Sequence, residues 1–372
     1  MQDFFLPVWY LLKYYMKIRL IGQRNNFGIG VHYTNFAIAL QKLSHWGLMV
    51  EEITFTDQSA LLIAAAESKP DDINICFVSI PLQHHFCGTN IQWVVFESTR
   101  VPPNIMSTML TADVVWVPST WGRDVLIQNG LDPSRCDAVP EGVDTDQFHP
   151  WHLPADDGIF RYLLTGKYER RKSITETIDA WAQVFGNNRT VELSIKTTHI
   201  MNHEENKKKI TEHIQHLGLT NINVWYGNLS QSELITLYQR HHVFVLPTKG
   251  EGWGLPLIEA AASGMPIVTT MWSGHTEFLN PIKNSVVPVE YDMVPVDCAE
   301  YQSFYPTEDQ DWGTWAQPRP QSIAHALVYA RDFFSELKAN AIANSDAIRR
   351  DFSWAQCANT AMKMLQKRGL LK

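Results

Sequence analysis

The sequence predicts an α/β protein built from two doubly wound, Rossmann-like domains in series. Its 372 residues are too many for one ordinary hydrophobic core and enough for two. From Lys17 onward, short apolar runs alternate with segments of helical periodicity, the pattern of βαβ units and parallel sheets. A segment rich in Pro, Gly and Asp at 140–155 separates two such series. Ligands of such sheets bind beyond the carboxyl ends of the strands, so we expect the functional site there.

The first series begins with an apolar strand over 17–23. A loop containing glycine follows, and then a helix that ends at Gly47. Further strands are expected over the apolar runs 73–80, 91–97 and 113–118.

The second series begins with a strand over 160–166. Ser173 with Glu176, and Ser230 with Glu233, have the spacing of a capping box, so each pair predicts the start of a helix. The other strands of this series are expected over 191–197, 222–227, 241–248 and 266–270.

A proline and a glycine mark the start and the end of a predicted helix late in this series. Pro256 suits the first turn of a helix, and Gly264 suits its C-terminal stop. The stretch 280–320, rich in Pro, Asp and aromatic residues, predicts an irregular insertion, and two helices are expected to close the chain.

The composition is that of a globular protein, with 45% hydrophobic and 19% charged residues. A formal net charge of −8 argues against nucleic acid or an anionic membrane surface as the main partner, because both require a basic surface. The five cysteines lack any disulfide or zinc-ligand spacing, which indicates reduced thiols and a cytoplasmic location.

Residues 1–16 are apolar and aromatic, but they carry Asp3 and Lys13. They lack a basic n-region and a cleavage site, and they are too short to span a bilayer. We therefore expect an N-terminal extension, either disordered or docked on the protein. Peripheral membrane contact through residues 1–16 stays open as an alternative.

The segment 248–277 carries the most informative pattern. Glu251 ends a predicted strand, and Glu259 lies in the first turns of the helix that follows. Between them, the backbone N–H groups of Gly252, Trp253 and Gly254 are expected at a helix N-terminus, where phosphate oxygens bind readily. The two carboxylates could accept hydrogen bonds from the paired hydroxyls of a sugar and a ribose. Alternatively, Glu251 is a solvated loop residue and Glu259 complements the helix dipole.

A basic cluster lies between the predicted strand 160–166 and the next helix. It comprises Lys167, Arg170, Arg171 and Lys172. Positive charges at a helix N-terminus are unfavourable unless an anion binds there, so the cluster indicates a phosphate site. A solvated run of charges is the alternative.

Gly28 and Gly30 lie at a turn from strand to helix in the first series. Because Glu51 and Glu52 follow at the distance of a ribose-binding acid, a dinucleotide-dependent dehydrogenase has to be considered. Tyr33 stands where the third glycine of that fingerprint belongs and should block close packing of the helix on the strand. We therefore interpret the two glycines as a loop whose backbone approaches a ligand.

Together these motifs resemble the retaining GT-B glycosyltransferases of the family-4 type, also called glycosyl transferases group 1. Glu251 and Glu259 form the E-x7-E motif in EGWGLPLIEAAASGMP. Lys167 and Lys172 match the basic pair of that family, with Lys167 where Arg is usual, and Ser173 stands where Gly is usual.

Further segments match in the same order along the chain. VPSTWGRDVLIQNG at 117–130 and GVDTDQFHP at 142–150 resemble the segments before the second domain, and the resemblance covers roughly residues 17–279. It implies an N-terminal acceptor-side domain at 17–150 that also takes a C-terminal helix at about 353–372. Residues 151–352 would form the nucleotide-sugar donor domain.

The resemblance also implies roles for single residues. Lys167 and Lys172 would hold the donor diphosphate, Glu251 the transferred sugar and Glu259 the ribose. Gly28 and Gly30 would line the phosphate side of the cleft. The backbone amides that would hold sugar and phosphate belong to Gly252, Trp253, Gly254 and Leu255.

The sequence departs from the family where many relatives place a His near the reaction centre. Glu97 stands there at the end of a predicted strand and is a candidate contact to acceptor or donor sugar. His84 and His85 are alternative candidates.

Two DxD patterns, Asp144-Thr145-Asp146 and Asp309-Gln310-Asp311, are typical of metal-dependent glycosyltransferases. Neither ends a buried strand, and the resemblance implies that Lys, Arg and helix dipoles neutralise the leaving diphosphate instead. No metal and no other cofactor is therefore expected.

The expected activity is metal-independent, retaining transfer of a hexose from a UDP- or GDP-linked sugar to a hydroxyl of a glycan, lipid or protein acceptor. A catalytically silent nucleotide-sugar-binding protein and a GT-B sugar-nucleotide epimerase are the alternatives. Lys172 is expected at the cleft surface, where its replacement should spare folding.

Overall fold

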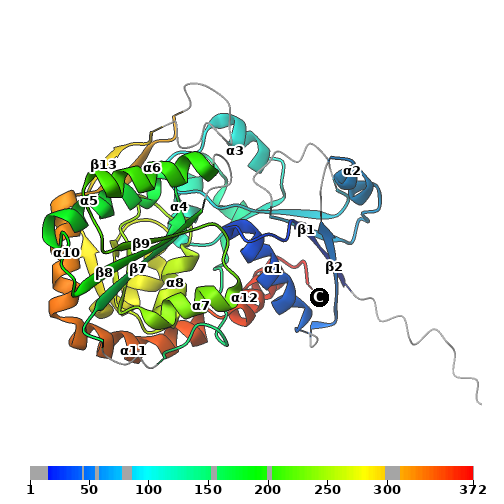
Figure 1. The fold of residues 1–372 in the computed structure, drawn as a ribbon. Coiled ribbons are helices and arrows are strands. Elements are labelled where there is room, and N and C mark those ends of the chain that lie inside the picture. The colour runs from blue at the N-terminus through cyan, green and yellow to red at the C-terminus, as the bar shows by residue number, and fades with distance from the viewer. Residues whose placement is uncertain are drawn as a thin grey trace, which may run out of the picture.

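The computed structural model describes residues 16–43, 46–54, 58–77, 86–151, 157–198, 203–297 and 311–371. Within them, two six-stranded parallel sheets carry helices on their faces, and a two-stranded antiparallel ladder lies beside the second sheet (Figure 1). The expected pair of doubly wound α/β units is thus confirmed. The predicted extension lies outside the described residues except for Met16, which begins the first strand.

The first sheet has the strand order β2-β1-β3-β4-β5-β6. Its strands are β1 (Met16–Gly22), β2 (Leu48–Thr54), β3 (Ile73–Cys76), β4 (Thr89–Trp93), β5 (Val114–Val117) and β6 (Cys136–Ala138). Its helices are α1 (Gly28–Gln41), α2 (Gln58–Ala66), α3 (Pro103–Met109) and α4 (Thr120–Gln128), with a short 3₁₀ turn at Pro133–Arg135.

The strand predicted over 91–97 is wrong at both ends. Residues 94–97 leave the sheet after β4, and this loop carries Glu97 toward the second sheet. The strand predicted over 73–80 ends at Cys76, and residues 78–80 lie outside the described part of the chain.

The second sheet has the strand order β12-β11-β10-β7-β8-β9. Its strands are β7 (Phe160–Lys167), β8 (Val191–Thr198), β9 (Ile222–Tyr226), β10 (Val243–Leu246), β11 (Ile267–Thr270) and β12 (Val286–Val289). Its helices are α5 (Ile174–Val184), α6 (His203–His216), α7 (Gln231–Arg240), α8 (Leu255–Ala262) and α9 (Thr276–Leu279), with 3₁₀ turns at Arg170–Lys172 and Asn280–Ser285.

One of the two predicted capping boxes is confirmed and the other is wrong. Ser230 and Glu233 form the capping box that begins α7. Ser173 does precede α5, but its side chain makes no capping bond and its backbone is left-handed, with φ 52°. Because glycine adopts this conformation without steric cost, the backbone here explains why Gly is usual at the position that Ser173 occupies.

The irregular insertion expected at 280–320 is wrong in its described part. There the chain forms β12, which completes the second sheet, and the antiparallel pair β13 (Tyr291–Pro295) and β14 (Thr314–Pro318). Three helices follow instead of the expected two: α10 (Pro320–Asp332), α11 (Phe334–Asp351) and α12 (Trp354–Lys367).

The last helix returns to the first sheet. Seven residues between Trp354 and Leu371 belong to the first hydrophobic core, and α12 lies against α1 (Figure 1). Where the chain makes this return, the Val143 amide donates to the Phe352 carbonyl at 2.8 Å. The segments that connect the two halves, near 143 and 353, therefore lie side by side.

Tyr33 does not block packing of the helix on the strand, contrary to the sequence prediction. Its ring is fully buried against Gly22 of β1, where an added Cβ would lie 2.5 Å from the ring. Gly22 of β1 therefore provides the space that a glycine in the helix would otherwise have provided.

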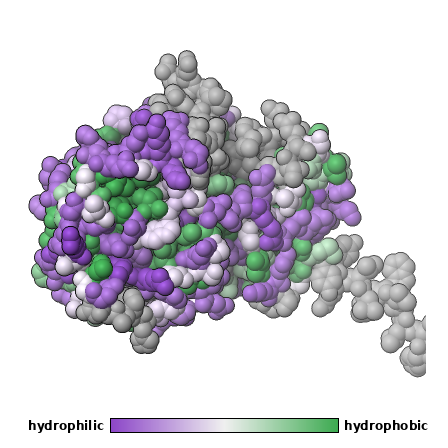
Figure 2. Space-filling view, in the orientation of Figure 1, coloured by the Kyte–Doolittle hydropathy of each residue, from purple (hydrophilic) through white to green (hydrophobic). Residues whose placement is uncertain are grey.

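Hydrophobic residues on the face drawn in Figure 2 gather mainly on the left, over the half built on the second sheet. No helix in the described part of the chain combines the length and apolar character needed to cross a membrane.

Candidate functional site

Glu251 lies in the loop that follows β10, and its side chain is buried. Its Oε1 atom lies 2.6 Å from the Lys172 ammonium and accepts a hydrogen bond from the Thr248 hydroxyl at 2.8 Å. Its Oε2 atom lies 3.1 Å from the Arg171 guanidinium. Glu251 is therefore the centre of a buried charge cluster and not a solvated loop residue.

Electrostatics keeps this carboxyl ionised. Burial raises the pKa of Glu251, but the charges of Lys172 and Arg171 outweigh it and hold the pKa at about 2. Burial and the Arg171 charge lower the pKa of Lys172, although Glu251 opposes them. The Glu251 carboxylate is therefore ionised at neutral pH.

Arg171 is the central residue that the sequence-based site omits. Its guanidinium lies 3.3 Å from Glu97, 3.0 Å from Glu169 and 3.1 Å from Glu251. It therefore connects the loop after β4 with the loop after β10. The sequence placed Arg171 in the basic cluster, but it gave no sign of which cation would be buried.

Lys167 is the last residue of β7 and is partly exposed, 3.0 Å from Glu169. Its ammonium also lies 6.0 Å from the centre of the Phe27 ring, which immediately precedes α1. Gly28 and Gly30 form the first turn of α1, so the N-terminus of this helix faces the basic cluster across the two halves. An added Cβ at Gly30 would lie 2.2 Å from the Asn25 side chain.

The two halves touch at two glycines of the second sheet's loop. An added Cβ at Gly250 would lie 2.2 Å from the Glu97 carbonyl oxygen, and one at Gly252 would lie 2.3 Å from the Val95 side chain. Only glycine permits this approach, and it brings Glu97 within reach of Arg171.

The loop from Glu251 into α8 leaves donors at the helix N-terminus. The backbone N–H groups of Gly252, Trp253 and Gly254 have no hydrogen-bond acceptor among the described residues. The Trp253 ring is buried against Phe278 and Phe352, which fixes the loop, and Leu255 begins α8. This arrangement suits an anion.

Glu259 lies in α8 on a separate set of partners. The Tyr238 hydroxyl donates to its Oε2 atom at 2.7 Å. Burial raises the pKa of Glu259 to about 7, against the opposing effects of this hydrogen bond and of the Lys196 charge. The two glutamates of the E-x7-E motif therefore lie in different environments.

The remaining sequence candidates either lie outside the described residues or are engaged with other partners. His84 and His85, and with them Asp309 and Gln310, lie outside the described residues. Asp311 forms an ion pair with Arg100, and Asp144 accepts hydrogen bonds within its own turn. The acids weighed for a dinucleotide site are engaged elsewhere: Glu51 pairs with Lys17 and Arg19, and Glu52 with Arg24.

The described part of the chain holds no group of three or more His, Cys, Asp or Glu side chains that could bind a metal ion. The polar groups near Glu251 are instead two cations and free backbone donors, which suit phosphate oxygens.

A comparison with protein families finds one family model that matches part of the chain. Residues 146–293 match the model "Glycosyl transferases group 1". Over this region, the chain is similar to the glycosyl transferases group 1 family. The matched region contains Lys167, Lys172, Glu251 and Glu259, so the resemblance inferred from the sequence is confirmed.

Curated relatives match this chain over parts of their length. MMP alpha-(1->4)-mannosyltransferase of Mycolicibacterium hassiacum is 29% identical over 169 residues, 45% of this chain and 39% of that protein. The serotype-specific mannosyltransferase WbdA of Escherichia coli is 30% identical over 107 residues, 29% of this chain and 13% of that protein. The chain thus spans well under half the length of these relatives.

A solved structure shows the same architecture over nearly the whole chain. HepE of Anabaena, in complex with UDP and glucose, superposes with a TM-score of 0.67 at 13% identity and covers 95% of this chain and 100% of that one. The chain therefore has the GT-B fold.

The sequence also missed a buried pair next to the cluster. His32 of α1 lies 3.4 Å from Glu141, and both side chains are buried. Burial raises the pKa of Glu141 to about 8, aided by the charges of Glu251 and Glu97, and burial lowers the pKa of His32 to about 3. Both groups are therefore neutral near pH 7. Neither belongs to a motif that would have marked it.

A small cavity adjoins Glu97 on the side of the first sheet. Its volume is about 70 Å³, and Phe96, Arg100 and Trp312 contribute to its lining. The Glu97 side chain therefore lies between this cavity of the first half and the Arg171 guanidinium of the second half.

Proposed function

We propose that the chain is a metal-independent, retaining glycosyltransferase that moves a hexose from a nucleotide-diphosphate sugar to an acceptor hydroxyl. The observation that carries this proposal is the buried cluster of Lys172, Arg171 and Glu251 beside free amides at the start of α8. Cations and amides suit a diphosphate, and an ionised carboxylate beside them suits the hydroxyls of the sugar.

In this proposal residues 151–352 hold the donor, and residues 17–150 with the helix at about 353–372 face the acceptor. Lys167, Lys172 and the amides of Gly252–Leu255 neutralise the diphosphate. Glu251 accepts from the sugar hydroxyls and Glu259 from the ribose. Gly28 and Gly30, at the N-terminus of α1, close the phosphate side.

The reaction exchanges one bond at the anomeric carbon. The bond from this carbon to the phosphate oxygen breaks, and its electron pair stays on the leaving diphosphate. The acceptor oxygen forms its bond on the same face, and its proton passes to a phosphate oxygen of the leaving group. Positive charge and amide dipoles stabilise the leaving group more as its charge develops, which lowers the barrier.

Glu97 is the candidate contact to the acceptor or to the transferred sugar, because it lies between Arg171 and the small cavity. A glycan, lipid or protein could supply the acceptor hydroxyl. The named relatives favour mannose as the first sugar to test, and the HepE complex adds UDP and glucose.

The test is slow hydrolysis of the donor without acceptor. Purified chain is incubated with GDP-mannose, UDP-glucose and UDP-galactose, and the released diphosphate is measured by chromatography. Hydrolysis of one donor that is lost in Glu251→Gln supports the proposal. Binding of a donor in a thermal-shift assay without hydrolysis or transfer indicates the silent binding protein instead, and conversion between sugar epimers indicates an epimerase.

A further inference from the structure

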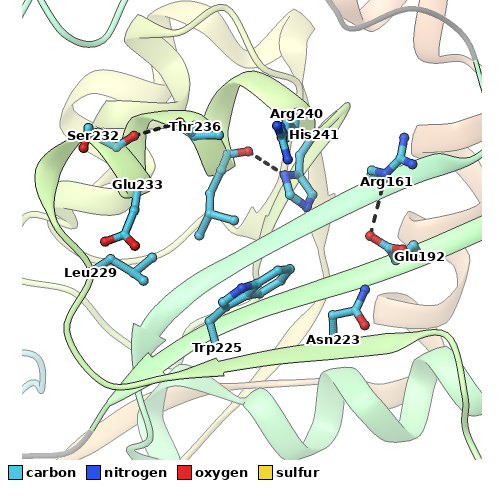
Figure 3. Close-up of a pocket in the computed structure, with 11 residues that line it drawn as sticks. Arg161, Glu192, Asn223, Trp225, Leu229, Ser232, Glu233, Thr236, Arg240 and His241 are labelled. Carbon is cyan, nitrogen blue, oxygen red and sulfur yellow. Dashed lines mark hydrogen bonds and ion pairs between the residues drawn. The ribbon is translucent and has the colours of Figure 1, made fainter.

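A second hollow lies on the second sheet, away from the charge cluster. It runs between α7 and the strands β7 to β9 and has a volume of about 430 Å³ (Figure 3). Arg161, which lines it, is the second residue of β7, and Lys167 is the last. About 20 Å of strand therefore separates this end of the hollow from Lys167. We call this hollow the α7 groove.

An aromatic side chain forms one wall of the α7 groove. Trp225 of β9 is 37% exposed, although it is one of the largest apolar side chains of this half. Asn223 lies two residues earlier on the same face of the strand, and its amide has no hydrogen-bond partner among the described residues. Figure 3 shows both side chains rising from the strand into the groove.

His241 supplies a second, buried observation. Its Nδ1 atom lies 2.5 Å from the Leu237 carbonyl oxygen, so Nδ1 carries the proton and Nε2 is a hydrogen-bond acceptor. The side chain is 3% exposed, and Nε2 has no partner in the described structure. Figure 3 shows this nitrogen directed toward the space above Trp225. A buried acceptor without a donor destabilises the protein, and a ligand hydroxyl that donates to it would remove this cost.

The charges around the groove balance one another. Arg161 lies 3.7 Å from Glu192 and donates to Asp157 at 3.0 Å. Glu233 accepts hydrogen bonds from Ser230 in the capping box of α7. The lining contains two cations, Arg161 and Arg240, and two carboxylates, Glu192 and Glu233, so the groove offers no net charge to an anionic ligand.

We propose that the α7 groove is a binding site for a neutral saccharide, distinct from the donor cleft. The apolar face of a sugar ring would lie on Trp225, and its hydroxyls would bond to Asn223 and to Nε2 of His241. An apolar platform with a few polar groups of both kinds is the lining that fixes such a ligand. The site goes beyond the proposed function, because binding there needs no donor and no catalysis.

Binding is tested by calorimetry and saturation-transfer NMR with three probes: maltotetraose, α-linked mannotetraose and, for comparison, UMP. We expect at least one tetrasaccharide to bind with a Kd of about 1 mM or tighter, the range of a single aromatic platform. Trp225→Ala should weaken this binding at least about tenfold, and Trp225→Phe should restore most of it. Asn223→Ala should weaken it less.

Tyr329→Ala is the matched control, because Tyr329 is 47% exposed and lies outside the groove. Failure of the unmodified chain to bind either tetrasaccharide, or equal loss in Tyr329→Ala and Trp225→Ala, overturns the proposal. Binding of UMP to the groove in place of the saccharides does so as well. Donor hydrolysis is measured in the same variants and should stay unchanged, so a failure of the groove is distinguished from a failure of the proposed function.

Discussion

The Lys172 ammonium lies 2.6 Å from the Glu251 carboxylate, and each side chain is 6% exposed. The two residues lie in the loops that follow β7 and β10, which are neighbouring strands of the second sheet. Their pairing means that the cation expected to hold a phosphate already has a carboxylate partner. A donor phosphate would therefore bring its negative charge to an ammonium that is already paired with a carboxylate, instead of binding to an unpaired cation.

Lys172→Ala is expected to lower both activity and stability. Donor turnover should fall by about two to three orders of magnitude, the scale for one preorganised charge donor. The free energy of unfolding should fall by up to about 3 kcal/mol, because a buried carboxylate loses one of its two cations. The sequence-based expectation that Lys172 lies at the cleft surface is wrong, because its side chain is buried. Single-turnover rates and urea denaturation measure the two effects.

Lys167→Ala serves as the control for this variant. Lys167 is partly exposed, so its loss should change the free energy of unfolding by less than about 1 kcal/mol while still reducing turnover. The double variant Lys172→Met/Glu251→Gln should recover stability without recovering turnover. A Lys172→Ala protein as stable as the unmodified chain would argue against the buried pair.

Glu251→Gln and Glu259→Gln are expected to fail differently. Glu251→Gln should spare affinity for the free nucleoside diphosphate and chiefly reduce transfer, because its proposed partner is the sugar. Glu259→Gln should weaken the free diphosphate and the donor alike, because both carry the ribose. Calorimetry beside single-turnover rates separates the two. Equal losses of diphosphate affinity in both variants would contradict the division of roles.

The pH dependence of nucleotide binding should report on Glu259. Its pKa of about 7 means that the carboxylate forms as pH rises through neutrality, and the ionised form is the stronger acceptor for ribose hydroxyls. Affinity for the free diphosphate should therefore rise severalfold between about pH 6 and pH 8. This rise should be absent in Glu259→Gln, and its persistence there would assign it to another group.

The contribution of Glu141 to the free energy of unfolding should decrease as the pH rises. Its folded pKa of about 8 lies above the ordinary value of 4.5, so between these values the native state binds more protons than the unfolded state. This contribution opposes that of His32, whose folded pKa of about 3 favours stability as pH rises toward 6.5. Glu141→Gln should therefore flatten the loss of stability between about pH 6.5 and 8, by an amount on the order of a few kcal/mol at most. Urea denaturation at several pH values measures it, and an unchanged slope would count against the raised pKa.

Chelation is expected to leave donor turnover unchanged, because Lys172, Lys167 and the α8 amides are proposed to neutralise the diphosphate. Excess EDTA is added during donor hydrolysis, with and without later Mn²⁺. Loss of turnover that Mn²⁺ restores would overturn the metal-independent mechanism.

The fold was predictable because alternation of apolar runs and helical periodicity is local. The capping box at Ser230 and Glu233 followed from spacing alone. Ser173 did not, because its left-handed backbone depends on how the basic cluster turns over Glu251, a contact across 79 residues. Strand β12 was missed because its pairing partner, not its own pattern, makes it a strand.

The sequence predicted those residues of the candidate site that belong to motifs, but not those that only tertiary packing brings there. Lys172 and Glu251 come together as the motifs implied. Arg171 bridges three carboxylates only because Gly250 lets the loop at Glu97 approach, and no pattern in the sequence encodes that approach. His32 and Glu141 meet for the same reason: their contact spans two elements that share no motif.

The return of α12 to the first sheet has a consequence for the order in which the protein folds. Trp354, Met362 and Leu365 complete the core beneath α1, yet they are synthesised after the entire second sheet. Domains generally fold as units during synthesis, with the N-terminal one first. Here the second half can complete its hydrophobic core on the ribosome while the core of the first half still lacks α12. The N-terminal half, although made first, must wait for its own last helix.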